Sequence, residues 1–294
     1  MDLILLDRTI QIFVIMAIFA VIVAISIISY VTLTENGNQS LDQKIIPANA
    51  SLSCNCVAFR LDDVMDKSIP NEIQYQIIDL FVEKEIPLTI GIIGNKFGND
   101  TSSVKLIKEY LQMPGNRIEI ANHGWNHEDF AVLSLQEQIM LIKKTNDKLD
   151  EKLEVFPRVF IPPFNRFNED TIQALKENEM THMSSIMSVD VPPYPLKDSK
   201  VYRFPATSTT AEFSDIEKKI WTPWSGNKTF NFISKSMSEN GFAVVMMHPR
   251  DFGQFQLRGN AVNYNQIQEL YFVIEKIIDS GWKFVPIGEI NLDS

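Results

Sequence analysis

Beyond residue 53 the chain alternates short runs of apolar, often β-branched residues with longer stretches in which apolar residues recur at helical spacing. The short runs lie at 56–61, 87–93, 117–121, 158–162, 183–187, 242–247 and 282–286. Largely apolar strands that alternate with helices are typical of a parallel sheet covered on both faces. The pattern therefore predicts an α/β fold, and its seven or so units favour a barrel over an open sheet.

Three of the helical stretches are marked especially well. Ser134 and Glu137 form a capping-box pair ahead of apolar residues that repeat at helical spacing through Leu153. A second helix covers residues 267–277, and we expect it to close at Gly281, because glycine is favoured just past a helix end. The third helix has its apolar residues at Ile73, Ile77, Leu80 and Phe81.

The N-terminal part of the chain does not follow this pattern. Residues 10–33 are almost wholly apolar, and as a helix they would span roughly 36 Å, enough for a hydrocarbon core of ~30 Å. We expect an uncleaved transmembrane anchor, because a secretory signal has a shorter apolar region and a small-residue cleavage site. Arg8 is the single preceding positive charge, so residues 1–9 are expected in the cytoplasm. A polar linker, 34–53, would then lead to one domain, 54–294, outside a cell membrane that the chain crosses once.

Composition and the number of cysteines limit which partners the protein could bind and bear on the compartment in which it works. The net charge is −10 and no stretch is rich in Lys and Arg. Nucleic acid, which needs a basic surface, is therefore excluded as a partner. Cys54 and Cys56 are the only cysteines; they could form a tight local disulfide, remain two thiols or provide half of a metal site. The sequence says nothing of the oligomeric state.

Residues able to carry chemistry follow four of the predicted strands. They are Asp62 and Asp63 after 56–61, His123 and His127 after 117–121, the segment 162–167 after 158–162, and His248 after 242–247. Active sites of parallel α/β folds lie at the C-terminal ends of the strands, so we expect these residues at one rim. A hydrolytic metal needs about three protein ligands and an open position, which two histidines and one carboxylate would supply. The other carboxylate could then act as general base, and His248 could protonate a leaving group.

The order of these motifs along the chain resembles that of the polysaccharide deacetylase family. The motifs are Asp-Asp, His-x-x-x-His, Pro-Pro-Phe and an apolar strand that ends in His. This family is the NodB-homology group of carbohydrate esterases, family 4, and the resemblance covers roughly residues 54–290. It implies an irregular (β/α) barrel of about seven strands and a divalent metal, zinc above all, with Co²⁺, Ni²⁺ or Mn²⁺ as alternatives. It also implies removal of N-acetyl groups from amino-sugar units of an envelope polysaccharide or oligosaccharide, with residues 54–294 as the catalytic domain.

The resemblance also assigns roles position by position. It makes Asp62 the general base, His248 the general acid, and Asp63, His123 and His127 the metal ligands. It places Pro163, Phe164 and Asn165 at the substrate, with a backbone N–H near Phe164 as part of an oxyanion hole. A water activated by the metal would give its proton to the base and attack the acetyl carbonyl, and the acid would protonate the departing amine.

Some positions depart from the family pattern. Ile161 stands where the family has an arginine that orients the base, and Arg60 and Arg166 are the two candidates to supply that cation. Arg60 lies two residues before Asp62 and therefore on the same side of a strand. The element that supports the acid histidine, an Asp near a Trp, is matched only by Asp190. Val64 and Asn165 also stand where the family has glycine.

Three further residues leave alternatives open. Trp221 and Trp224 could stack on sugar rings or could pack a loop under the barrel rim. His182 precedes the run 183–187, so we expect it at the opposite end of the barrel, in a structural role.

The sequence therefore favours a membrane-anchored, metal-dependent deacetylase of an envelope polysaccharide. One alternative is a hydrolase of the same fold that acts on another amide or on an acylated sugar. Another is a non-catalytic glycan-binding protein of the envelope, which would be expected to lack a metal ligand or the acid.

Overall fold

The computed structural model describes residues 54–66, 71–115, 118–190, 201–215, 220–254 and 261–290. All of them belong to the second of two compact units into which the chain divides, residues 1–49 and 50–294. The expected anchor (10–33) and linker (34–53) lie outside the described residues, so both stay predictions. Within the described part of the chain, no helix has the length and apolar character needed to cross a membrane.

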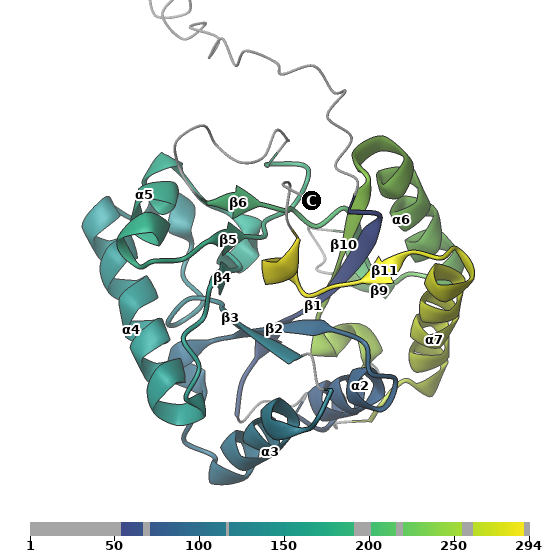
Figure 1. Ribbon diagram of the computed structural model, residues 1–294, viewed down its shortest axis with the longest axis horizontal. Coiled ribbons are helices and arrows are strands. Elements are labelled where there is room, and N and C mark those ends of the chain that lie inside the picture. The colour runs from purple at the N-terminus through teal and green to yellow at the C-terminus, as the bar shows by residue number, and fades with distance from the viewer. Residues whose placement is uncertain are drawn as a thin grey trace, which may run out of the picture. The chain divides into compact units, whose positions relative to one another are not determined.

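A parallel sheet forms the centre of the domain, and helices lie around it (Figure 1). The order of its strands is β6-β5-β4-β3-β2-β1-β10-β7, and β11 also pairs with β1. The strands are β1 (Cys56–Val64), β2 (Leu88–Ile92), β3 (Ile118–Asn122), β4 (Val159–Phe160), β5 (His182–Met183), β6 (Tyr202–Arg203), β7 (Ser208–Thr209), β10 (Phe242–Met247) and β11 (Lys283–Phe284). All of these pairings are parallel, which confirms the predicted α/β class, and the strands form a partial barrel.

The seven predicted strands are all present, but β4, β5 and β11 are only two residues long. Of the run predicted at 183–187, only Met183 belongs to a strand, since β5 consists of His182 and Met183. Four strands were missed: β6, β7 and the antiparallel pair β8 (Ala211–Asp215) and β9 (Ile220–Pro223). Strands of two residues are too short to show a periodicity, and β8 and β9 are largely exposed rather than apolar.

The helices begin and end close to their sequence signals. They are α2 (Asn71–Glu83), α3 (Thr101–Gln112), α4 (Leu135–Leu153), α5 (Glu169–Glu177), α6 (Gly226–Asn240) and α7 (Tyr264–Asp279). Ser134 and Glu137 form the predicted capping box of α4. Gly281 follows the C-cap of α7 with φ at +70°, where a glycine has no steric penalty. Five short 3₁₀ turns complete the elements: η1 (Gly94–Lys96), η2 (Phe130–Val132), η3 (Pro163–Asn165), η4 (Pro249–Phe252) and η5 (Ile287–Glu289).

Strand β1 separates two apolar clusters because successive side chains point to opposite faces. Phe59 and Leu61 belong to the outer cluster, which includes residues of α2 and α7. Cys56 and Ala58 belong to the inner cluster, together with Val244 of β10. The same alternation turns residues 60 and 62 inward. A charged pair, Arg60 and Asp62, is therefore carried into the interior by a strand whose other side chains form the core.

A single segment, residues 202–209, connects the two ends of the sheet. Its first part, β6, pairs with β5, and its last part, β7, pairs with β10. Between them the N–H of Ala206 donates to Ser185 and that of Thr207 donates to Val244. The segment therefore crosses from one end strand to the other and completes the enclosure of the inner cluster.

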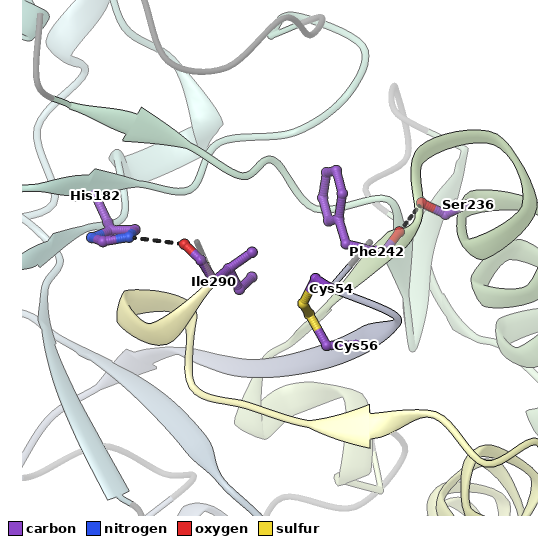
Figure 2. The surroundings of a disulfide bond; sticks show 6 residues. All are labelled: Cys54, Cys56, His182, Ser236, Phe242 and Ile290. Carbon is purple, nitrogen blue, oxygen red and sulfur yellow. Dashed lines mark hydrogen bonds between the residues drawn. A yellow bond between two sulfur atoms is a disulfide. The ribbon is translucent and has the colours of Figure 1, made fainter. Parts of the chain in front are cut away.

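The two cysteines lie at the end of the barrel where the strands begin, opposite the end at which the candidate site residues lie (Figure 2). Cys54 and Cys56 form a disulfide with a Cα–Cα distance of 5.1 Å, which selects one of the three alternatives that the sequence allowed. His182 also lies at this end, as predicted, and is buried. Its Nε2 donates to the carbonyl of Ile290 at 3.2 Å, and Nδ1 accepts from the hydroxyl of Thr181 at 2.9 Å. Both ring nitrogens thus have structural partners.

We expect His182 to make the protein less stable in mild acid. Burial lowers the pKa of His182 below its ordinary value of about 6.5. As the pH falls through 6.5, the unfolded chain binds a proton that the folded chain does not, so this residue lowers the free energy of unfolding by up to about 1.4 kcal/mol per pH unit. Urea unfolding at pH 7.5 and 5.5 should show a larger loss in the unaltered chain than in His182→Gln. Equal losses would contradict the prediction.

Candidate active site

Most of the candidate residues line one cavity of about 660 Å³ at the C-terminal ends of β1, β3 and β10. They are Asp62, Asp63, His123, His127, Phe164, Asn165 and His248. Pro163 differs from the prediction: it is buried in η3, and its neighbour Pro162 lines the cavity instead. The described structure thus brings together segments that are nearly 190 residues apart, as expected for residues at the strand ends of a parallel sheet.

Asp63, His123 and His127 bring one carboxylate oxygen and two imidazole nitrogens within 4.8 Å of one another. Oδ1 of Asp63 lies 3.3 Å from Nε2 of His123 and 3.1 Å from Nε2 of His127. Metal–ligand distances of about 2.0–2.2 Å put the donors of a tetrahedral site roughly 3.4 Å apart. The three donors therefore already have about the spacing that one ion requires.

The hydrogen bonding of His123 indicates that a cation fits between these donors. Its Nδ1 lies 2.7 Å from the carbonyl oxygen of Ile161, and a carbonyl only accepts, so Nδ1 carries the proton. In the neutral ring Nε2 is then an acceptor that faces the acceptor oxygen of Asp63. Two acceptors at this distance repel each other unless a proton or a metal ion lies between them. A carbonyl that fixes the tautomer is also a common second partner of metal-ligating histidines, so the residues fit a divalent metal.

The backbone around the candidate ligands is bent away from regular structure. Asp62 and Asp63 are adjacent and would face opposite sides of a regular strand, yet both line the cavity. The register of β1 shifts between Leu61 and Val64, and Asp63 has φ at 63°. His127 is also in the left-handed region, with φ at 66°. Such conformations cost of order 1–3 kcal/mol each and cluster at functional sites, and here they aim two ligands at one point.

Charge favours an ionised ligand at Asp63. Burial alone would raise the pKa of Asp63, but the contacts with His123 and His127 outweigh it and hold the pKa below its ordinary value. The carboxylate is therefore in the form that binds a metal.

Arg60 lies beneath Asp62 as a fully buried guanidinium. Its Nη2 lies 3.2 Å from Oδ2 of Asp62 and also donates to Oδ1 of Asn165. Its Nη1 donates to the backbone carbonyls of Ser184 and Ser185. Burial lowers the pKa of Arg60, while Asp62 acts in the opposite direction. Of the two candidate cations, Arg60 is thus the one that contacts Asp62.

Arg166 does not contact Asp62. It forms an exposed ion pair with Asp129 at 2.9 Å, with more than half of its side chain accessible. The prediction that Arg166 could orient the base is therefore wrong, because residue 166 follows η3 and its side chain lies over the loop that precedes η2.

The turn at η3 lies at the cavity and contains a backbone N–H without a described acceptor. Phe164 and Asn165 both have φ at 57°, and Phe164 is exposed on the cavity wall. The N–H of Asn165 donates to Pro162 at 2.9 Å. Among the described residues no acceptor bonds to the N–H of Phe164. This N–H is thus a donor without an acceptor among the described residues, and its part in an oxyanion hole stays a prediction.

His248 ends β10 and contacts a carboxylate that the sequence analysis did not single out. Its Nδ1 lies 3.7 Å from Oδ2 of Asp251, and its backbone N–H donates to the same oxygen at 2.9 Å. The same carboxylate accepts from Nε1 of Trp221 at 2.8 Å and from the hydroxyl of Thr210 at 2.7 Å. Asp251 is therefore fixed on both oxygens; it holds the backbone of His248, and its carboxylate lies within ion-pair distance of the imidazole.

Asp190 does not have the supporting role that the sequence predicted for it. Its carboxylate pairs with Arg203 at 2.6 Å, and both side chains are buried. Burial raises the pKa of Asp190 to about 6, although Arg203 acts in the opposite direction. Asp251, and not Asp190, thus lies beside His248. The signal for Asp251 is local: the three-residue spacing in "HPRDF" brings it back to His248 over the 3₁₀ turn η4.

We expect Asp251→Asn to move the alkaline limb of the pH–rate profile to lower pH. Burial would lower the pKa of His248, but the carboxylates of Asp251, Asp62 and Asp63 outweigh it and raise the pKa. An acid must be protonated, so the rate falls as the pH rises through this pKa. Removing the nearest carboxylate should shift the limb down by about one pH unit or more. Glu212→Gln is the matched control, because Glu212 lines the same cavity but pairs with Lys228; an unmoved limb in Asp251→Asn would contradict the role.

The two tryptophans differ in what they offer to a ligand. Trp224 is buried, packs against Phe232 and has the ammonium of Lys228 3.8 Å from its ring centroid. Trp224 thus packs as one of the two alternatives predicted, although it also borders the cavity. The ring of Trp221 is nearly perpendicular to that of His248, with centroids 5.7 Å apart, and the guanidinium of Arg250 lies 4.0 Å from the Trp221 centroid. One face of Trp221 is thus already covered.

A family model described as polysaccharide deacetylase matches residues 49–183 of this chain. The match includes the carboxylate pair and both ligand histidines but ends before His248. Among curated proteins, the uncharacterized protein YlxY of Bacillus subtilis (strain 168) is 26% identical over 121 residues. That similarity covers 41% of this chain and 36% of the relative, so the chain spans little more than a third of that protein's length.

Three solved structures share the fold. One is a pseudoenzyme of the CE4 family from Bacillus anthracis, with a TM-score of 0.54, 17% identity, and 81% of this chain and 66% of that chain covered. Another is a family 4 acetyl xylan esterase from Clostridium thermocellum in complex with a cobalt ion (TM-score 0.53, 15% identity, 80% and 89% covered). The third is a peptidoglycan N-acetylglucosamine deacetylase (TM-score 0.53, 18% identity, 82% and 89% covered). At these identities the likeness shows the fold alone.

Proposed function

We propose that the chain is a member of the polysaccharide deacetylase family, whose model matches residues 49–183. In this proposal it is a metal-dependent hydrolase that removes N-acetyl groups from amino-sugar units of an envelope polysaccharide. One observation carries the proposal. A three-donor metal set, a carboxylate with a buried guanidinium partner, and a histidine with its own carboxylate all line one cavity. A fold retained only for binding has no need of this combination.

Each group of the chain would have a defined task. Asp63, His123 and His127 would hold the ion, which when bound acts as a Lewis acid and lowers the pKa of water. Oδ1 of Asp62 has no hydrogen-bond partner among the described residues, while Oδ2 is held by Arg60, so Oδ1 is the atom that would accept a proton. The N–H of Phe164 would donate to the developing oxyanion. His248, kept protonated by Asp251, would give a proton to the departing amine.

The substrate class rests on the family and on the size of the cavity. A cavity of about 660 Å³ holds much more than an acetyl group, so part of a glycan would enter it. The fold is shared with both an N-acetylglucosamine deacetylase and an acetyl xylan esterase. An ester of an acylated sugar is therefore the alternative substrate that the experiment must include.

We also propose that the protein is anchored in the cell membrane through residues 10–33 and that its domain lies on the outer side. The disulfide between Cys54 and Cys56 supports this location, because disulfides persist in oxidising compartments and are rare in the cytosol. Zinc is the proposed metal, because one carboxylate and two imidazoles with an open position suit it; Co²⁺, Ni²⁺ or Mn²⁺ would also fit.

The test combines metal analysis with two substrates. The purified full chain should contain about one divalent ion and should release acetate from chito-oligosaccharides faster than from acetylated xylan. Treatment with a chelator should abolish release, and added Zn²⁺ should restore it. Faster release from acetylated xylan would favour the ester alternative. A full complement of metal without acetate release from either substrate would favour the non-catalytic alternative, which the structural likeness to a pseudoenzyme brings to attention.

A further inference from the structure

The cavity wall carries one guanidinium that the proposed reaction does not use. Arg250 lies in η4, two residues after His248, and its side chain is exposed on the wall of the cavity. The chain as a whole is strongly acidic, with a net charge of −10. An exposed cation beside the candidate acid is therefore not explained by the general charge of the surface.

The carboxylates of the same wall all have partners of their own. Asp62 pairs with Arg60 at 3.2 Å, and Asp63 contacts the two ligand histidines. Glu212 pairs with Lys228 at 2.6 Å. Within the described residues, the side chain of Arg250 has neither an ion pair nor a hydrogen bond. Among the described residues its charge thus has no acidic partner.

Arg250 is nevertheless held in place. Its guanidinium carbon lies 4.0 Å from the ring centroid of Trp221 and 5.8 Å from that of Phe213. Trp221 is itself fixed through Nε1, which donates to Asp251. Contact with an aromatic face uses the flat side of the guanidinium and leaves the N–H groups at its edge free. A guanidinium that is held in place, with its fork of N–H groups free to donate, is the arrangement that binds a carboxylate or a phosphate through two parallel hydrogen bonds.

We propose that Arg250 is a specificity-determining residue that binds an anionic substituent, a carboxylate or a phosphate, on the glycan. This inference rests on the proposed function, because it takes the cavity to be a glycan site. Trp221 contacts both Arg250 and His248, with its ring 5.7 Å from and nearly perpendicular to that of the histidine. The anionic group would therefore be carried by the sugar whose amine leaves or by its neighbour. The preferred substrate is an acidic amino-sugar polymer rather than a neutral one.

The test measures binding instead of turnover. Full chain carrying Asp62→Asn, which is expected to slow the reaction enough for a binding measurement, is titrated calorimetrically with three chito-oligosaccharides of equal length: unmodified, carboxymethylated and 6-phosphorylated. The chain should bind at least one charged form more tightly than the neutral form. Arg250→Gln should weaken binding of that form about 10- to 30-fold and change neutral binding less than about twofold. Arg250→Lys should recover only part of the loss, because lysine keeps the charge but not the fork.

Arg158→Gln is the matched control. It removes the same charge from an exposed arginine just before β4, at the opposite end of the barrel, and should change neither affinity. Three results would overturn the inference: equal binding of neutral and charged forms, an equal loss for both in Arg250→Gln, or no binding of any form. Charge-selective binding by the variant, together with no acetate release by the unaltered, metal-loaded chain, would keep this inference and overturn the proposed function.

Discussion

Exchange of Asp62 for asparagine is expected to lower kcat for acetate release by about two to four orders of magnitude while the bound metal stays stoichiometric. Oδ2 of Asp62 is held 3.2 Å from Arg60, and Oδ1 is buried without a hydrogen-bond partner among the described residues. Asparagine keeps the shape and one acceptor but cannot take a proton. Acetate release at substrate saturation, with elemental analysis of the same sample, measures both quantities.

The adjacent carboxylate provides the matched control. Asp63 is the residue whose oxygen lies 3.3 Å and 3.1 Å from the two histidines, so Asp63→Asn should lose metal and activity together. The two variants differ by one position in the chain and carry the same change of charge. Loss of metal from Asp62→Asn would show that Asp62 is a ligand. A rate near that of the unaltered chain would place the base elsewhere.

Replacement of Arg60 by methionine should lower the free energy of unfolding by about 3–5 kcal/mol. The guanidinium is fully buried, and methionine would leave Asp62 as a buried charge without its partner. The carbonyls of Ser184 and Ser185 would also lose a donor. Acetate release should fall as well, because Asp62 would lose the counter-charge that favours its ionised form. Urea unfolding and acetate release test the two parts separately.

Two variants separate the role of the guanidinium from general damage. Arg166→Ala removes an exposed ion pair and should change stability by no more than about 1 kcal/mol. Ile161 is buried in the same inner cluster, where the family places its arginine. Arg60→Met combined with Ile161→Arg should therefore recover part of the lost rate. If Arg60→Met kept the original rate, Asp62 would not depend on this cation.

The sequence predicted the metal set because its signals are local. The histidine spacing and the Asp pair stand directly after recognisable strands, and in parallel folds strand ends meet at one rim. Arg60 was predicted as a candidate from the two-residue period of β1 alone. The α/β class followed from apolar runs that are long enough to be recognised. Strands β2 and β10 were located to within one residue at each end, whereas β1 begins where predicted but runs on to Val64.

The roles that could not be predicted from the sequence depend on contacts between segments that are far apart in the chain. Asp190 and Asp251 each stand near a predicted strand, and only the fold shows that Arg203 neutralises the first while the second faces His248. Trp221, whose indole N–H donates to Asp251, lies on a hairpin that the hydrophobic pattern did not predict. The contact of Arg250 with the ring of Trp221 likewise depends on the directions of the two side chains, which the spacing of residues along the sequence does not reveal.

The segment that joins the two ends of the sheet has a consequence for solubility. A strand at the margin of a sheet exposes unpaired N–H and C=O groups, which invite pairing with another chain and aggregation. Here the marginal strands β6 and β7 have two residues each and are consecutive parts of one segment, so neither offers a long template for such pairing. The margins of the central sheet are thus protected from strand-to-strand association when many copies of the domain come close together.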